Sequence, residues 1–278
     1  MTIPSGKDLT LERGRGTTFS VNMEGVAATV ASVAINGETT DYTAVSNALT
    51  AANDATSEAS VTLFKDYSAT VSFSNGSAPI VLDLNGRTIA GQIAVAAGTS
   101  LTINDSSDGA GKVTKNTANT TIVNNGTLAI NGGAFENTST KYALINQNSG
   151  TVTINGGSFT SSSAQTIYNY SGTMTINGGS FKNEYTGTTQ STGAVVYVNT
   201  GSAEINGGYY YTCTTATTKR CFLKTNSGTV NITSAYFNTG IAAGYRDTAT
   251  TTFSSSANVK HSHNGVELTY AASILPNS

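Results

Sequence analysis

The chain has 278 residues, which is enough for one large domain or two small ones. Only 11% of the residues are charged and the formal net charge is -2, so charge supplies no case for nucleic acid or an anionic membrane as a partner. No run of about 18 apolar residues occurs, and the sequence therefore excludes a membrane-spanning helix.

Residues 1–29 are interpreted as rung-like strands left from a preceding region, because Thr2 to Leu11 reads as strand, turn, strand. Met1 to Pro4 has neither the basic nor the apolar part of a signal peptide. Either the protein is cytosolic or a leader was removed before this start. We favour the second alternative, which predicts an extracellular or cell-surface location.

Residues 30–75 are predicted to form a cap region that contains one helix, at about 42–55. A strand-like alternation over 30–35 comes first, followed by the turn Asn36–Gly37. Asp41 or Thr43 can cap the helix, which presents one apolar face and is rich in Ala. We expect this helix to cover one open end of a stack of strands, because uncovered strand edges promote aggregation.

Residues 76–240 contain a repeated phrase of the form Thr-Xaa-Thr-Ile-Asn-Gly-Gly-Ser-Phe. Its central Ile stands at 130, 154, 176, 205 and 232, and an earlier match places Ile103 before the first of them. Repeats of roughly 20–50 residues are typical of solenoids. The last segment, 241–278, is predicted to be a C-terminal cap and tail.

Each repeat holds three short strands separated by turns of Asn, Gly and Ser. Alternation within the second strand sends its apolar residues to one side, and a single repeat cannot bury them. The predicted fold is all-β: a right-handed parallel β-helix with three strands per rung and one short capping helix. The column that stacking should bury consists of Leu128, Ile130, Val152, Ile154, Met174, Ile176, Ala203, Ile205, Val230 and Ile232.

The most regular polar feature is an Asn that follows the repeated Ile. Stacked Asn side chains can bond to one another, as amide ladders do in cross-β assemblies, so we predict a structural and buried ladder. The Gly pair after each Asn is expected to supply positive φ at the same corner. The predicted ladder comprises Asn131, Asn155, Asn177 and Asn206.

Cys213 and Cys221 stand eight residues apart inside the step from Ile205 to Ile232. One interpretation is a disulfide that closes a loop bulging from the solenoid, which would indicate an oxidising compartment. The alternative is two unpaired thiols near the core, because spacing alone does not show that the two Cα atoms approach each other.

Tyr residues gather in consecutive repeats, and the chain contains no Trp. Neighbours in a strand alternate, so some of these rings must point outward, where they suit stacking on sugar rings or on a protein. The opposing interpretation is Tyr packed beneath loops. The candidate ligand-binding residues are Tyr168, Tyr197, Tyr209, Tyr210 and Tyr211.

Catalysis is a weaker interpretation, although many β-helices cleave polysaccharides. Glycoside cleavage needs paired carboxylates, and the three acids within 127–240 occupy different places in their repeats. Asp105 to Gly109 resembles a fragment of a calcium loop without the distal Glu, and the two His of the tail lack a third ligand. We therefore predict no catalytic residue, no metal site and no cofactor.

The succession VASVAINGETTDYTAVSNALTAA, SVTLFKDYS, IVLDLNGRTIAG, LTINDSSDGAGKV and repeated TINGGSF resembles the cell-surface, pectate-lyase-like β-helix proteins of Gram-positive anaerobes. The resemblance covers roughly residues 30–245 and implies a piece of a large secreted adhesin. It implies a non-enzymatic module that presents a rigid polar surface to a glycan or to a host or cell-surface protein. The alternatives are a polysaccharide lyase or hydrolase, or its inactive relative, and a phage tail-fibre domain.

Overall fold

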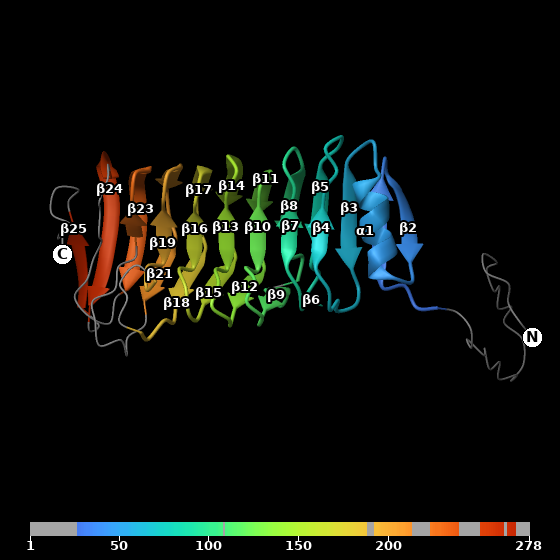
Figure 1. The fold of residues 1–278 in the computed structure, drawn as a ribbon, viewed down its shortest axis with the longest axis horizontal. Helices are drawn as coiled ribbons and strands as arrows, with labels where there is room; N and C mark the ends of the chain where they lie inside the picture. The colour runs from blue at the N-terminus through green and yellow to red at the C-terminus, as the bar shows by residue number, and fades with distance from the viewer. Residues whose placement is uncertain are drawn as a thin grey trace, which may run out of the picture.

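The computed structural model describes residues 27–107, 109–187, 192–212, 223–238, 251–263 and 266–270. Within these residues the chain forms a parallel β-solenoid of about 7 turns with one short helix, which confirms the predicted all-β repeat fold. Figure 1 shows the turns side by side along one axis, with the helix near the N-terminal end and β25 near the other. The right-handed coiling stays a prediction.

The strands form three parallel ladders, because each strand pairs with the equivalent strand of the next turn. We number the ladders in the order in which the chain enters them within one turn. The first ladder, which is the seven-stranded sheet, contains β4 (Val71–Phe73), β7 (Ile93–Val95), β10 (Ile122–Asn124), β13 (Leu144–Asn146), β16 (Ile167–Asn169), β19 (Val196–Val198) and β22 (Leu223–Thr225).

The second and third ladders belong to one larger sheet, because β23 (Thr229–Asn238) is long enough to join both. Before β23, the second ladder contains β5 (Ile80–Asp83), β8 (Ser100–Asn104), β11 (Thr127–Ile130), β14 (Gly150–Ile154), β17 (Gly172–Ile176) and β20 (Ser202–Ile205). The third contains β6 (Thr88–Ile89), β9 (Lys112–Lys115), β12 (Ala134–Asn137), β15 (Ser158–Ser161), β18 (Ser180–Asn183) and β21 (Tyr209–Thr212).

At each end, the second ladder continues through one more parallel strand, β3 or β24, to which an antiparallel strand is added. At the N-terminal side β5 pairs with β3 (Ala59–Leu63), which pairs with the hairpin of β1 (Ala31–Ile35) and β2 (Glu38–Tyr42). The Asn36–Gly37 turn has φ of 53° and 80°, as a type I′ hairpin turn requires. At the other side β23 pairs with β24 (Thr251–His263), and β24 pairs with β25 (Val266–Tyr270).

Helix α1 (Val45–Asn53) is shorter than the predicted 42–55, and the predicted caps are wrong. Ala44 is the N-cap and makes no side-chain cap hydrogen bond. The reason is that the residues before it extend β2, where Tyr42 accepts a hydrogen bond from the Val30 N–H at 2.8 Å. The helix buries Val45, Leu49 and Ala52 and packs against β1, β3 and β4.

The predicted register and the predicted buried column of the second ladder are confirmed. Val152 lies on Leu128, and Ile154 lies on Ile130. All ten predicted residues are at most 2% exposed. A parallel column forms inside the third ladder, where the rings of Phe135, Phe159 and Phe181 stack at centroid distances of 4.9 and 5.1 Å.

A fully buried Asn ladder stands where the first ladder turns into the second. Asn124 donates to the Oδ1 of Asn146 at 2.8 Å, and Asn146 donates to the Oδ1 of Asn169 at 2.9 Å. The same amides also donate to backbone carbonyls of the turns, including the Gly150 carbonyl at 2.9 Å from Asn146. This ladder satisfies polar backbone groups that the tight turns leave inside the solenoid.

Candidate functional site

The outer face of the first ladder differs from the outer faces of the other two. Its three-residue strands turn their middle residue outward, and over five consecutive turns this residue is apolar or aromatic. In the second ladder the equivalent outward residues are Thr102, Ala129, Thr153, Thr175 and Glu204. The outward residues of the first ladder, which we call the outer strip, are Ala94, Val123, Ile145, Tyr168 and Tyr197.

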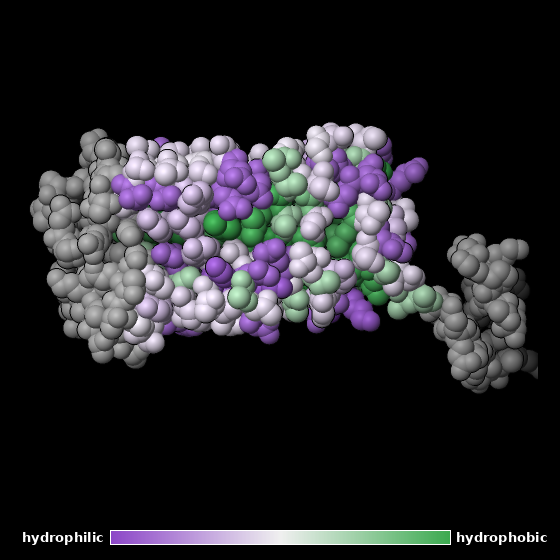
Figure 2. Space-filling model, viewed as in Figure 1, coloured by the Kyte–Doolittle hydropathy of each residue, from purple (hydrophilic) through white to green (hydrophobic). Residues whose placement is uncertain are grey.

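The outer strip is continuous along the solenoid axis. Each residue pairs directly with the next, and every member is partly exposed. Four steps of about 4.8 Å make the strip roughly 19 Å long. Figure 2 shows apolar side chains in green along the middle of the face on which Figure 1 labels β4, β7, β10 and β13, between polar margins.

Four Tyr rings form a cluster at one end of the strip. Tyr168 and Tyr197 stack with centroids 4.9 Å apart and planes at 10°. Tyr142 tilts against Tyr168 at 4.8 Å, and Tyr170 meets Tyr168 edge-on at 5.7 Å. The facing surfaces of Tyr168 and Tyr197 therefore cover each other, whereas Tyr170 is 48% exposed and has the most accessible ring of the cluster.

Three hydroxyls of this cluster, those of Tyr142, Tyr168 and Tyr197, are held in the neutral form. Burial raises the pKa of Tyr168 to about 12, and the neighbouring Tyr197, Tyr142 and Tyr170 add to the shift. Burial likewise raises the pKa values of Tyr142 and Tyr197. Neutral phenols both donate and accept hydrogen bonds, so the cluster can bond to an uncharged polar ligand.

The margin of the strip on its C-terminal side includes several amides. Asn148 donates to Asn125 at 2.6 Å, and Asn226 donates to Asn199 at 3.0 Å, so these side chains are themselves stacked between turns. The strands β7, β10, β13, β16 and β19 contain no charged residue. The site thus combines an apolar floor with neutral hydrogen-bonding groups.

The five candidate Tyr do not share one surface. Tyr168 and Tyr197 belong to the outer strip. Tyr209 and Tyr211 point outward from the third ladder, where Tyr209 contacts Tyr236 at a centroid distance of 5.4 Å. Tyr210 is fully buried, stacks on Phe181 at 5.0 Å and donates its hydroxyl to the Gly207 carbonyl at 2.8 Å.

The sequence interpretation missed the aliphatic half of the strip and Tyr142. The available signal was the middle position of the first strand in each repeat, which runs Val123, Ile145, Tyr168, Tyr197. A three-residue apolar strand does not by itself show which of its sides faces the core.

The predicted Asn ladder exists, but it faces solvent. Asn155 donates to Asn131 and Asn177 donates to Asn155, both at 2.8 Å. Asn206 donates to Asn177 at 3.1 Å, and Asn104 extends the ladder by accepting from Asn131. All four predicted residues are exposed, so the expected burial is wrong.

The Gly pairs that follow these Asn serve two different needs. The second Gly of each pair has positive φ, as at Gly157 with 89°. The first has ordinary φ, and in three of the four pairs it has no room for a side chain: a Cβ at Gly156, for example, would stand 2.7 Å from the carbonyl oxygen of Asn131. The expectation of positive φ therefore holds for one Gly of the pair.

The acids considered for catalysis have other contacts. Glu136 pairs with Lys112 at 3.0 Å, Glu184 pairs with Lys182 at 2.8 Å, and Glu204 accepts a hydrogen bond from Asn231 at 3.2 Å.

Asp105 accepts from the Gly86 and Gly111 N–H groups and from the Ser107 hydroxyl. Burial opposes the charged form of Asp105, but these hydrogen bonds outweigh it and lower its pKa. Its contacts are those of a turn. Among the described residues, no three His, Cys, Asp or Glu side chains are grouped as metal ligands, and no helix is long and apolar enough to cross a membrane.

Cys213 and Cys221 lie outside the described residues, and their disulfide stays a prediction. Comparison of the chain with protein families, with curated proteins and with solved structures found no match.

Proposed function

We propose that this chain is a non-enzymatic adhesion module that is displayed outside the cell and binds a neutral glycan along the outer strip. The observation that carries the proposal is the series of five apolar or aromatic residues on a solenoid whose second ladder presents mainly Thr hydroxyls at the equivalent position. Exposed apolar surface rimmed by polar groups is typical of binding sites.

The chemistry of the strip suits a sugar chain. Pyranose rings have apolar C–H faces and a rim of hydroxyls, which match an apolar floor bordered by Asn125, Asn148 and Asn199. Tyr170 supplies an accessible ring, and the hydroxyls of Tyr142, Tyr168 and Tyr197 supply neutral donors and acceptors. An aromatic contact contributes about 0.5–1.5 kcal/mol beyond burial, so one site is weak and many displayed copies multiply the effect.

The test is a glycan array probed with the full chain, followed by titration of the bound glycans. Ile145→Glu places a carboxylate in the strip, and we expect affinity to fall by at least about tenfold, because the charge must lose water on binding. Thr153→Glu is the matched control: it adds the same charge to the same turn, on the outer face of the second ladder.

Binding should change little with salt, because the strip strands are uncharged. Equal affinity of the two variants would refute the strip as the site, and an array without any bound glycan would refute the glycan as ligand. Reducing-sugar and lyase assays on the same glycans complete the test. Turnover of a glycan would show that the chain is an enzyme and would refute the non-enzymatic adhesion module.

A further inference from the structure

The N-terminal edge of the second ladder is open, whereas neighbouring residues cover the corresponding edges of the first and third ladders. In the first ladder, the side chain of Asn53 covers the edge of β4: its Nδ2 donates to the Ser72 carbonyl at 2.9 Å, and its Oδ1 accepts from the Ser74 N–H at 2.8 Å. In the third, Tyr67 forms a parallel bridge to Ile89 of β6. β2 pairs with β1 alone among the strands that the structure describes.

The free edge of β2 presents a defined set of backbone groups. The two-residue turn places Glu38 opposite Ile35, and Thr40 opposite Val33. Antiparallel pairs next to such a turn alternate between bonded and non-bonded, so Thr39 and Asp41 turn their N–H and C=O groups toward the open edge. An added extended chain would find two donors and two acceptors there, as in β-strand addition.

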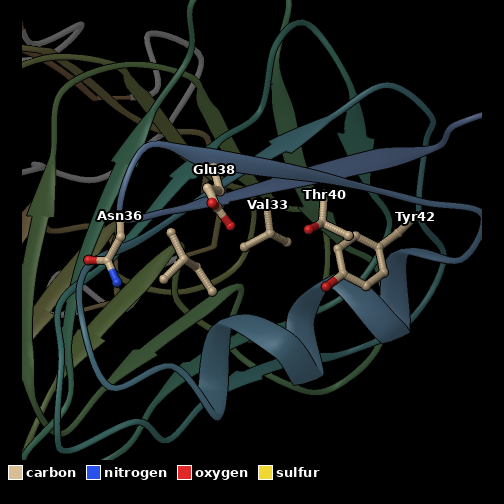
Figure 3. Close-up of a pocket in the computed structure, with 6 residues that line it drawn as sticks. Val33, Asn36, Glu38, Thr40 and Tyr42 are labelled. Atoms are coloured by element: carbon tan, nitrogen blue, oxygen red, sulfur yellow. The ribbon is translucent and has the colours of Figure 1, made fainter.

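A hollow lies beside this edge and offers room for side chains. It has a volume of about 470 Å³ and is lined by Val33 and Ile35 of β1, by Asn36 of the turn, and by Glu38, Thr40 and Tyr42 of β2. Figure 3 shows Val33, Thr40 and Tyr42 directed toward the side on which α1 lies. Because side chains alternate in a strand, every second residue of an added chain would enter this hollow.

The charge around the edge selects the partner. Residues 27–64 contain Glu38, Asp41, Asp54 and Glu58 and neither Lys nor Arg. Glu38 and Asp41 are exposed, and Asp41 accepts a hydrogen bond from the Thr29 hydroxyl at 3.3 Å. Pairing of β2 with β2 of a second copy would bring these carboxylates together, whereas a basic strand would neutralise them.

We propose that β2 binds an extended, basic segment of another protein by β-strand addition. Backbone hydrogen bonds to Thr39 and Asp41 hold the segment, alternate apolar side chains fill the hollow, and a Lys or Arg meets Glu38. This site lies at the N-terminal end of the solenoid and is independent of the glycan proposed for the outer strip.

The test measures binding of a fluorescein-labelled peptide, Thr-Lys-Val-Lys-Val-Thr, to the full chain by fluorescence anisotropy. Thr39→Pro removes an edge N–H and should abolish binding, whereas Thr39→Val keeps it and should bind as the wild type does. Glu38→Lys should weaken binding about tenfold or more, since like charges then meet, and added salt should weaken wild-type binding. A peptide N-methylated at alternate residues should not bind, which gives the same information if Thr39→Pro does not fold.

Three results would overturn the proposal. The first is equal binding of a peptide in which Glu replaces both Lys. The second is unchanged binding by folded Thr39→Pro or by the N-methylated peptide. The third is strong protection of the Thr39 and Asp41 amides from hydrogen exchange in the free protein, because the edge is then already filled. Light scattering of the same sample shows whether that occupant is a second copy or the chain itself.

Discussion

Replacement of Asn146 by Ala should destabilise the solenoid far more than replacement of Asn155 in the same repeat. Both side chains take part in Asn ladders, but Asn146 is fully buried and Asn155 is exposed. The Nδ2 of Asn146 lies within hydrogen-bond distance of the Gly150 carbonyl, the Asn169 Oδ1 and the Thr173 carbonyl, at 2.9, 2.9 and 3.2 Å. Water cannot replace these contacts without a cavity that admits it.

The magnitude follows from the groups left without a donor. Loss of the amide leaves the Asn169 Oδ1 and at least one carbonyl unpaired, at about 1–3 kcal/mol each, so Asn146→Ala should cost about 2–6 kcal/mol. Asn124 keeps the Gly126 and Thr151 carbonyls as acceptors, at 3.0 and 3.1 Å, and adds little. Asn155→Ala should cost only about 0.5–1.5 kcal/mol, because water replaces the lost partners.

Urea denaturation followed by circular dichroism measures the global loss, and hydrogen exchange of β13 and β16 measures the local loss, since repeats can open separately. Asn146→Asp tests the cause, because it keeps the shape and replaces the donating nitrogen by an oxygen; it should destabilise at least as much as Ala. Free energies of unfolding for Asn146→Ala and Asn155→Ala within about 0.5 kcal/mol of each other would refute this reasoning.

Three further predictions concern packing, backbone and pH. Ile154→Ala should cost about 2–5 kcal/mol by leaving a cavity, and Thr153→Ala on the opposite side of the strand should change the melting temperature little. Gly157→Ala should cost about 1–3 kcal/mol more than Gly98→Ala in urea denaturation. Both positions have positive φ, but an added Cβ would stand 2.8 Å from the Gly133 carbonyl at Gly157 and would have no neighbour within 4 Å at Gly98, so equal losses would exclude packing as the cause. Stability should fall as pH rises between about 10 and about 12, because burial and neighbouring Tyr raise the pKa of Tyr168 to about 12 from its ordinary value of 10.0 and the unfolded chain then binds fewer protons. Denaturation midpoints that do not change across this window would contradict the burial of the Tyr cluster.

The period of the repeat determined the fold and most of the second ladder. A repeated Ile and the alternation around it require stacking, because a single repeat has nothing against which to bury its apolar side. The position of Tyr210 was also present in the sequence: it stands ninth in its copy of the phrase, where Phe135, Phe159 and Phe181 stand in the others. Alignment of the copies would have placed this ring inside, as the structure does.

Only the tertiary structure decided which polar and apolar columns face water. Asn146 and Asn155 each belong to a series that recurs about once per turn, and each follows an Ile. Asn146 is buried because it takes an inward position of β13, where its amide donates to the Gly150 carbonyl of the turn, whereas Asn155 follows the inward Ile154 and faces solvent. Likewise Ile145 is apolar yet points outward, because its neighbours Leu144 and Asn146 both face the interior. Burial in a solenoid depends on the direction of each corner, which is set by contacts between turns and not by the residue type alone.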